Sequence, residues 1–369
     1  MKVVIASHIS HSNEGLPGFG TGEGIASFIA SEKYPFLFIK HALYDGWNTR
    51  IEEYDKKIPR IYYKGLILSF PFRIIQEIYV TLHLLYKHKP SLYIGIDPLN
   101  ALYGIFGRII GIRYRLIYYT ADYANIRFRN RFLNAVYHYI DSIALRFSDE
   151  VWNISTRINN LRKKQGIKNS FFVPNILFNK KIIRIYPEKR NSIILISTIS
   201  YAYIDFPLLL KDISTVIKYL PGIRVNIIGS GPDVLRLKKE VIKMKLEKNI
   251  YIIGAVPHRN LSHYLNVSNI GLALYTGYEP WTYYGDSMKT REYLSYGIPV
   301  IITKHCSTSD DISANNMGIV IPRKKGKLAN ALLQMLSNKK LYAQMRMNAL
   351  QYSKYDSIYT FLQTHLINA

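Results

Sequence analysis

The chain has 369 residues, 48% of them hydrophobic, and it contains a single cysteine. This composition excludes a disordered, a collagen-like or a disulfide-stapled protein, and the length is typical of two domains that each bury a core. Lysine and arginine outnumber aspartate and glutamate by 49 to 25. The resulting net charge of +24 indicates an anionic partner, either nucleic acid, a membrane surface or a phosphate-bearing substrate.

In the first half, short β-rich runs alternate with amphipathic helical patterns, which is typical of a parallel sheet covered by helices. The predicted strands are 3–6, 36–39, 91–96, 115–119, 150–154 and 171–173, and the predicted helices are 24–31, 72–88, 101–110, 131–146 and 156–165. Residues 175–190 carry Lys, Arg, Asn and Pro without periodicity, so this segment is the predicted linker region.

A second alternation of the same kind begins at residue 192. The predicted strands are 192–196, 224–228, 250–252, 270–273, 299–302 and 318–321, and the predicted helices are 208–219, 234–244, 260–267, 288–296, 327–337 and 339–368. Two successive α/β domains are therefore expected. No uncharged apolar run reaches the roughly 18 residues needed to span a bilayer, and the first residues lack a secretion signal. We therefore expect a cytoplasmic protein.

The segment from Gly285 to Val300 carries the clearest chemistry. Its Lys289 and Glu292 are three residues apart, which places an ammonium and a carboxylate on one helix face beside the free amides of the first turn. A ligand with a diphosphate and a vicinal diol, such as a nucleotide sugar, would use both groups. The alternative is a surface helix with an i,i+3 salt bridge, which is common and weak.

A glycine pair lies upstream, in Ile227-Ile-Gly-Ser-Gly-Pro232, between a predicted strand and a predicted helix. Glycines there allow close backbone approach to a ligand at the carboxyl edge of a sheet. The motifs then follow in order as Ile253-Gly-Ala-Val-Pro257, Ile270-Gly-Leu-Ala-Leu274 and the helix of Lys289 and Glu292. This ordered set resembles the family-4-type (GT4-like) glycosyltransferases of the GT-B fold.

The resemblance implies an α/β protein with two Rossmann-like domains that face each other across a cleft. We expect a first, acceptor-side domain over residues 1–178, a linker over 179–190 and a nucleotide-sugar-binding domain over 191–345. A C-terminal helix over 346–369 is expected to pack back on the first domain.

The resemblance also implies roles for residues of the second domain. Glu292 matches the carboxylate that binds the ribose hydroxyls, and Lys289 matches a basic residue beside the diphosphate that also serves catalysis. The other implied donor-binding residues are Gly229, Ser230, Gly231, Val256, Pro257, Asp286, Ser287, Met288 and Thr290. Family members retain the anomeric configuration and need no metal, so the only expected co-substrate is a nucleotide sugar such as a UDP- or GDP-sugar.

In the first domain, a glycine-rich loop follows the first strand, and its candidate residues are Gly18, Gly20, Thr21 and Gly22. Family members present backbone amides to phosphate or acceptor there, and the alternative is a mobile surface loop. Asp97 and Asp122 lie at strand ends and are candidates on the acceptor side, with Asp122 also a catalytic candidate. Either carboxylate could instead only cap a helix.

Two positions depart from the family pattern. Ala121 occupies the place of a histidine that meets the donor sugar, and Tyr284 occupies the place of a glutamate. Glu279, a further catalytic candidate, or Asp286 could substitute for that glutamate. Asp310 and Asp311 are expected in a solvated loop or cap. His258 and His263 are five residues apart, off the spacing of a helical metal pair, so no metal site is expected.

The charge surplus needs its own explanation. Residues 56–89 hold seven basic residues and one acidic residue, interleaved with aromatic residues, and the predicted helix 72–88 suits either an anionic membrane surface or a core position with basic ends. Because acceptors of this family are often lipid diphosphate-linked sugars, we expect a hexosyltransferase that is peripheral at the inner face of the cell membrane and works in cell-surface glycan or glycoprotein assembly. A nucleotide-sugar epimerase is the nearer alternative. A nucleic-acid-binding protein is disfavoured, because no zinc-finger, RNP or helix-turn-helix motif is present.

Overall fold

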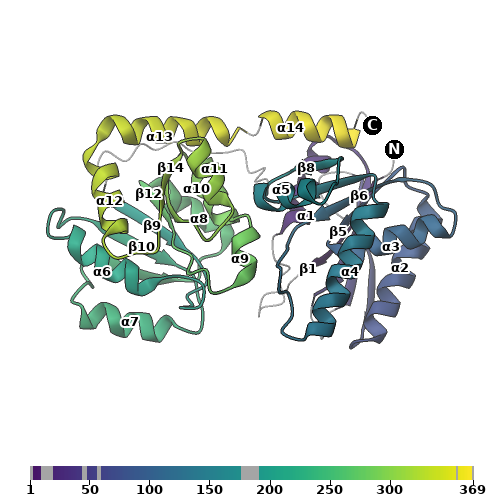
Figure 1. Cartoon of the computed structure of the whole chain (residues 1–369), viewed down its shortest axis with the longest axis horizontal. Helices are drawn as coiled ribbons and strands as arrows, with labels where there is room; N and C mark the ends of the chain where they lie inside the picture. Colours follow the sequence, from purple (N-terminus) through teal and green to yellow (C-terminus); the bar gives the residue numbers. More distant parts are fainter. Residues whose placement is uncertain are drawn as a thin grey trace. The chain divides into compact units, whose positions relative to one another are not determined.

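The computed structural model describes residues 3–9, 20–43, 48–55, 60–175, 191–354 and 356–367. The chain divides into two compact units, of which the first comprises residues 1–178 with 357–369 and the second comprises 179–356 (Figure 1). Each unit contains one sheet with helices against its faces. Within the described residues, none of the helices is both long and apolar enough to cross a bilayer.

The sheet of the first unit has eight strands in the order β4-β3-β2-β1-β5-β6-β7-β8. Its strands are β1 (Val3–Ile9), β2 (Phe36–Ala42), β3 (Asn48–Tyr54), β4 (Arg60–Ile67), β5 (Leu92–Ile96), β6 (Arg115–Thr120), β7 (Glu150–Asn153) and β8 (Ser170–Phe172). The central strands are parallel and buried on both faces, which explains their nearly continuous apolar sequences. The edge strands β3 and β4 pair antiparallel.

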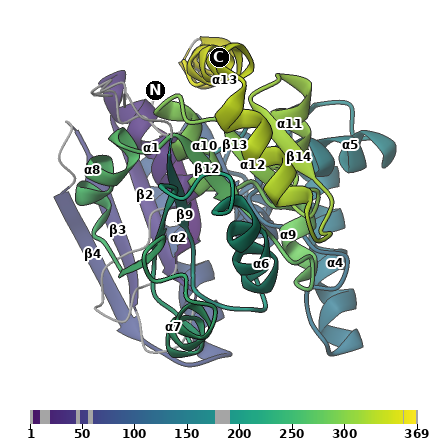
Figure 2. The ribbon, with the colours of Figure 1, turned by 90° about the vertical axis from the view of Figure 1, so that its left-hand side faces the viewer.

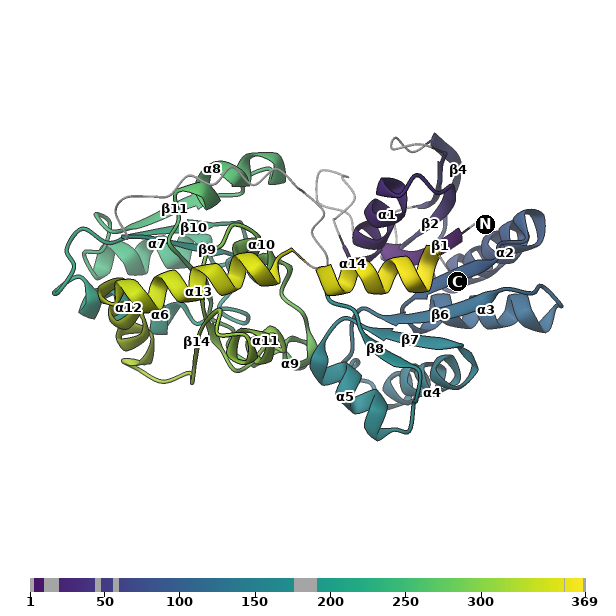
Figure 3. The same cartoon turned by 90° about the horizontal axis from the view of Figure 1, so that it is seen from above.

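Helices cover both faces of this sheet. They are α1 (Thr21–Ser31), α2 (Phe72–His88), α3 (Pro98–Ile109), α4 (Arg131–Phe147), α5 (Thr156–Lys164) and α14 (Asp356–Leu362), which continues into a π-helical turn, Gln363–Ile367. Helices α2, α3 and α4 form one layer (Figure 1). Helix α14 lies beside α1 and β8 (Figure 3), where Tyr359 contacts Phe28 edge-on and the rings of Phe361 and Trp152 lie 5.4 Å apart. The end of the chain therefore completes the core of the first unit.

The sheet of the second unit is entirely parallel, in the order β11-β10-β9-β12-β13-β14. Its strands are β9 (Ser192–Ile196), β10 (Arg224–Ile228), β11 (Ile250–Gly254), β12 (Ile270–Ala273), β13 (Val300–Thr303) and β14 (Gly318–Ile321). Its helices are α6 (Phe206–Val216), α7 (Val234–Lys243), η1 (His258–Asn260), α8 (Leu261–Asn266), α9 (Pro280–Tyr284), α10 (Met288–Ser295), α11 (Thr308–Ala314), α12 (Lys327–Ser337) and α13 (Lys339–Tyr352). Figure 2 shows α6 and α12 side by side against this sheet.

Most predicted elements are present within a few residues of their expected bounds, and the differences have physical reasons. The strands β3 and β4 were not predicted, because charged residues such as Arg50, Glu52 and Lys64 interrupt their apolar pattern. The expected last helix is two helices. Helix α13 packs against α10 and α12 of the second unit, and only residues from 357 onward belong to the first unit.

The strand orders place a topological switch point in each sheet. The chain moves from β1 outward to β2 and later returns to the other side of β1 as β5, and it moves from β9 to β10 and returns beside β9 as β12. Loops diverge at the carboxyl ends of these strands, which leaves room for a ligand.

The glycine pair after β10 serves close chain packing. Gly229 has φ of +144°, and a Cβ atom there would lie 1.8 Å from the carbonyl oxygen of Ser197, while one at Gly231 would lie 2.4 Å from that of Ile199. The Ile199 amide donates to the Ser230 carbonyl at 2.9 Å. These glycines therefore admit the backbone of the loop after β9, and the expectation that they also approach a ligand stays a prediction.

We predict that Gly229→Ala lowers the free energy of unfolding of the second unit by about 3 kcal/mol or more, because a backbone carbonyl cannot rotate away as a side chain can. Urea unfolding followed by circular dichroism measures the effect. Gly222→Ala is the matched control, since its Cβ would meet only the Asn191 side chain at 3.9 Å, and it should change stability by less than about 0.5 kcal/mol. Equal unfolding midpoints for the two variants would contradict the packing argument.

Candidate active site

Helix α10 begins beside the switch point of the second sheet, and its start is firmly held. The Ser287 hydroxyl caps the helix by accepting from the Thr290 amide at 3.2 Å, and the Ser287 amide donates to the Thr308 hydroxyl at 2.8 Å. The amides of Met288 and Lys289 lie in the first turn of α10, so neither has an acceptor carbonyl four residues earlier within the helix. These two N–H groups can therefore bind an anion.

Glu292 lies one turn further along α10 and pairs with a histidine from the loop after β11. Its Oε1 atom is 3.0 Å from His258 Nε2, and the Glu292 side chain is mostly buried. This hydrogen bond raises the pKa of His258 against the opposing effect of burial. The structure thus brings the predicted residues Lys289 and Glu292 to the same helix start, together with His258, a hydrogen-bond partner of Glu292 to which no role was assigned from the sequence.

Asp286 has a different role from the one predicted. Its carboxylate accepts from Arg291 Nε at 3.0 Å and from the Thr308 hydroxyl at 3.0 Å, and the same guanidinium pairs with Asp311. The Arg291 and Asp286 side chains are fully buried. Asp286 is therefore structural rather than donor-binding, and Asp311 lies in helix α11 as a buried ion-pair partner rather than in a solvated loop. Thr290 is also buried and bonded to Ser287.

The other predicted donor-side residues surround the same sheet edge. Val256 is half-buried and packs on the core, and Pro257 immediately precedes His258. Glu279 stands at the start of α9 with its side chain half-buried, and among the described residues its carboxylate makes no hydrogen bond. Glu279 remains a candidate to contact a ligand in place of the family glutamate, whose position is occupied here by Tyr284.

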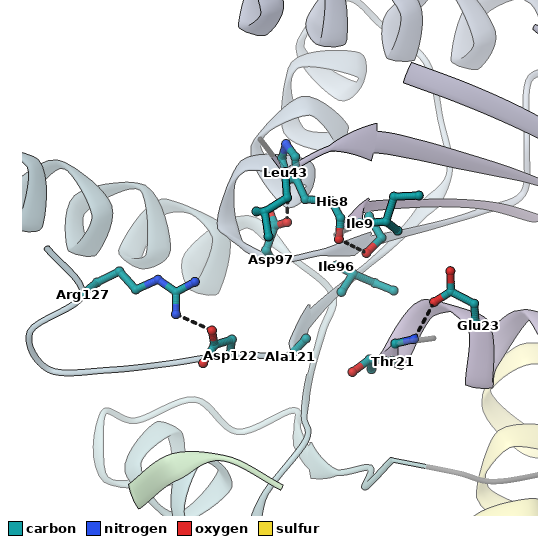
Figure 4. A pocket seen from close by; sticks show the side chains of 12 residues that line it. His8, Ile9, Thr21, Glu23, Leu43, Ile96, Asp97, Ala121, Asp122 and Arg127 are labelled. Carbon is teal, nitrogen blue, oxygen red and sulfur yellow. Dashed lines mark hydrogen bonds and ion pairs between the residues drawn. The ribbon is translucent and has the colours of Figure 1, made fainter. Parts of the chain in front are cut away.

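In the first unit, a cavity of about 220 Å³ lies at the carboxyl ends of β1, β5 and β6 and the start of α1 (Figure 4). Among the predicted residues, it is lined by Gly20, Thr21, Asp97, Ala121 and Asp122. The strand ends thus bring together the two aspartates that the sequence analysis placed on the acceptor side. The cavity lies at the switch point between β1 and β5.

Three charged side chains in successive contact, Glu77, His8 and Asp97, form the floor of this cavity. His8 Nδ1 is 2.7 Å from Asp97 Oδ2, and His8 Nε2 is 3.0 Å from the fully buried Glu77. Glu77 also accepts from the Tyr103 hydroxyl at 2.9 Å. Burial alone lowers the pKa of His8, but the two carboxylates outweigh it and raise the pKa to about 10. His8 is therefore a cation at neutral pH.

The remaining first-unit predictions have mixed outcomes. Asp122 pairs with Arg127 at the rim of the cavity. Gly22 is buried in the core, where a Cβ atom would lie 2.7 Å from the Phe38 ring, so its glycine is explained by packing and not by a ligand. Gly18 lies outside the described residues. Within the described residues, no group of three or more His, Cys, Asp or Glu side chains could hold a metal ion.

The sequence analysis missed His8, Glu77 and His258. His8 follows the predicted strand 3–6 by two residues, which is a signal that could have been used, whereas His258 lies in the loop after the predicted strand 250–252. Glu77 is the single acidic residue in the basic stretch 56–89, and its burial depends on where α2 packs on the sheet.

Because the pKa of His8 is raised from 6.5 to about 10 in the folded protein, its contribution to stability is complete below pH 6.5 and is lost as the pH rises toward 10. We predict that the free energy of unfolding falls with pH in this window, by up to about 1.4 kcal/mol per pH unit from this group. Urea titrations at several pH values measure the slope, and His8→Asn should remove this component. The same slope in both proteins would contradict the assignment.

The chain is similar to known proteins in sequence family and in fold. Residues 179–352 match the family model of the glycosyl transferases group 1. No curated protein sequence matches the chain.

Solved structures resemble the whole chain. HepE of Anabaena in complex with UDP superposes with a TM-score of 0.72 at 13% identity, over 100% of both chains. Sucrose-phosphate synthase from Thermosynechococcus elongatus gives a TM-score of 0.71 at 12% identity, over 99% of this chain and 98% of that one. The lipopolysaccharide outer core galactosyltransferase WaaB gives 0.69 at 17% identity, over 100% of both chains. Residues 179–352 therefore match the glycosyl transferases group 1 family, and the whole chain has the GT-B fold.

Proposed function

We propose that this protein is a retaining, metal-independent hexosyltransferase that moves a sugar from a nucleotide sugar to a glycan or a lipid-linked saccharide in cell-surface glycan or glycoprotein assembly. The observation that carries the proposal is the pairing of Lys289 and Glu292 at the start of α10, beside the switch point of the second sheet. That helix lies inside the segment that matches the family model.

The donor would use each group at the start of α10. The Glu292 carboxylate accepts hydrogen bonds from the two ribose hydroxyls, and the His258 contact at 3.0 Å fixes its orientation. The Lys289 ammonium and the amides of Met288 and Lys289 receive the diphosphate. HepE, which shares the fold, has been solved with UDP and with UDP-glucose.

The same groups would supply the chemistry. Glycosyl transfer passes through an oxocarbenium-like state while negative charge grows on the departing diphosphate. Fixed positive groups at that diphosphate stabilise the transition state more than the ground state, so Lys289 and the helix start provide the main catalytic term. The half-buried Glu279 would bind hydroxyls of the transferred sugar. Asp97 and Asp122 would meet the acceptor in the first unit.

We predict that Glu292→Gln weakens nucleotide-sugar binding by at least tenfold, because a neutral amide cannot accept two charge-assisted hydrogen bonds from the ribose. Isothermal titration with UDP-, GDP- and ADP-sugars measures the affinity of the whole chain. Glu247→Gln is the matched control, since Glu247 is exposed in the turn before β11, and it should bind as the parent does.

Product analysis then separates the alternatives. Slow release of free sugar from the donor, or transfer to added glycans, supports a transferase, whereas interconversion of nucleotide sugars would indicate an epimerase. Unchanged donor affinity in Glu292→Gln would remove this residue from the site. Tight, salt-sensitive binding to random DNA without donor binding would favour a nucleic-acid-binding protein instead.

A membrane-held acceptor is supported by the exposed side chains of the first unit. The aromatic face, as we name it, has large apolar side chains that point outward from α2 and α4 of one helix layer: Phe72, Ile75, Tyr79, Tyr86, Phe132, Val136 and Tyr139. Phe132 is 74% exposed. Apolar side chains gathered in this way mark an interaction site.

The exposed charged residues on α2 and α4 indicate which kind of partner this face would bind. The acidic residues of α2 and α4 are Glu77 and Asp141, and both are buried and paired with cations or hydrogen-bond donors. The exposed charges on α2 and α4, such as Arg131 and Lys87, are therefore basic. Aromatic side chains with basic neighbours are the pattern of a surface that rests on an anionic bilayer.

We predict that the purified protein binds vesicles containing anionic phospholipid at physiological salt, and that Phe132→Asp with Tyr139→Asp weakens this binding by at least fivefold. Cosedimentation with vesicles measures the bound fraction. Tyr219→Asp is the control, because Tyr219 is equally exposed on the second unit, and it should leave binding unchanged. If the parent protein does not bind anionic vesicles, the membrane proposal is wrong, whereas the donor-binding proposal is unaffected.

A further inference from the structure

The floor of the first-unit cavity contains a linear arrangement of charges that the donor chemistry does not use. The side chains of Glu77, His8 and Asp97 are 0%, 9% and 27% exposed, in the order in which they contact one another. Of these three side chains, Asp97 is the most exposed, and its carboxylate lines the cavity (Figure 4). The buried end anchors the exposed end through His8.

Asp97 is held in an unusual backbone conformation. Its φ is +77°, in the region that residues other than glycine seldom adopt and that costs about 1–3 kcal/mol. The amide of Asp97 donates to the Tyr119 carbonyl at 3.1 Å, and its Oδ1 atom accepts from the Asn100 amide at 3.1 Å. Several contacts thus fix the carboxylate where it meets the cavity, which is typical of a functional site.

The cations around the cavity are already neutralised. His8 lies between two carboxylates, Arg127 pairs with Asp122, and Lys40 lies 3.4 Å from Glu23, which also lines the cavity. An anionic ligand would meet three carboxylates and, among the described lining residues, no cation without a partner. The volume of about 220 Å³ is below the roughly 300 Å³ of pockets for drug-sized ligands, and it suits a single sugar ring.

We propose that this cavity binds an uncharged, hydroxyl-bearing sugar ring of the acceptor, that Asp97 accepts a hydrogen bond from one hydroxyl, and that His8 and Glu77 are the positioning residues for Asp97. The inference rests on the proposed transferase function and names the acceptor group. It places any phosphate of the acceptor outside the cavity, although the whole protein carries a large positive charge.

The electrostatics of the chain fit this role. The protonated His8 holds the pKa of Asp97 below its usual range, against the opposing effect of burial. Asp97 therefore stays ionised and orients a hydroxyl without removing its proton. The other groups that face His8 are Asn100 and Tyr103 from α3, Arg73 beside Glu77 on α2, and His41 from β2. Burial lowers the pKa of His41 to about 4, so His41 is neutral and does not compete for the carboxylates.

The test uses the full chain with ¹⁵N-labelled histidine and follows the imidazole resonances by NMR. The neutral probes are the methyl glycosides of glucose, galactose, mannose and N-acetylglucosamine, and the charged probes are methyl glucuronide and glucose 6-phosphate. At least one neutral glycoside should shift the His8 resonances, with an affinity at least tenfold above that of either charged probe. Stronger binding of a charged probe, or no binding by any neutral glycoside, would overturn the proposal.

Variants then test the roles of Asp97 and Glu77. Asp97→Asn should weaken binding of the neutral glycoside at least tenfold. Glu77→Gln keeps the shape but removes a charge that holds the proton on His8, so its glycoside affinity should fall as the pH rises from 6 to 8.5, whereas that of the parent stays constant. A merely structural role of Glu77 would weaken binding equally at all pH values. Asp55→Asn, at the opposite edge of the sheet, is the matched control.

Donor titration of the same variants separates two kinds of failure. If nucleotide-sugar affinity is intact in Asp97→Asn and the parent ignores every neutral glycoside, the acceptor inference is wrong and the proposed function stands. If the parent binds no nucleotide sugar, the proposed function itself fails. Glycoside binding that is unchanged in Asp97→Asn would remove this carboxylate from the site.

Discussion

Burial of a parallel sheet on both faces is the constraint from which the arrangement of both units follows. The central strands of each unit are covered by helices, so their side chains form a dry core and cannot meet a ligand. Polar side chains become available only where the strands end, and the switch points are where neighbouring loops separate. His8 and Asp97 in the first unit, and the start of α10 in the second, occupy these positions. The chemistry is thus confined to one edge of each sheet.

The same constraint explains what could be predicted from the sequence. Strands such as β10, β12 and β14 and helices such as α2 and α12 have the predicted bounds, because continuous apolar runs and helical periodicity survive in buried elements. Lys289 and Glu292 could be placed side by side because they lie three positions apart on one helix. The contacts of Asp286 and Gly229 could not be predicted. Arg291 is only five residues from Asp286, but its burial against Asp311, like the approach of Ser197 to Gly229, arises from tertiary packing.

The charge surplus, which first indicated only an anionic partner, now has a distribution. At the start of α10 it is represented by Lys289, and on α2 and α4 it lies beside exposed aromatic rings. Around the first-unit cavity, the described cations His8, Arg127 and Lys40 each have a carboxylate partner. A strongly basic protein can therefore contain a site that is locally acidic. Attraction over the whole surface and recognition at one site are separate properties of this molecule.

Arg291 connects the start of α10 with the end of α13. The guanidinium fixes the beginning of α10 through Asp286, and its Nη1 atom donates to the Tyr352 hydroxyl at 2.7 Å. Tyr352 is the last residue of α13, a few residues before the chain leaves the second unit and joins the core of the first. A shift of α10 must therefore carry Tyr352 with it or break this bond. The residue that holds the start of α10 is thus also in contact with the last residue of α13, a few residues before the chain returns to the first unit.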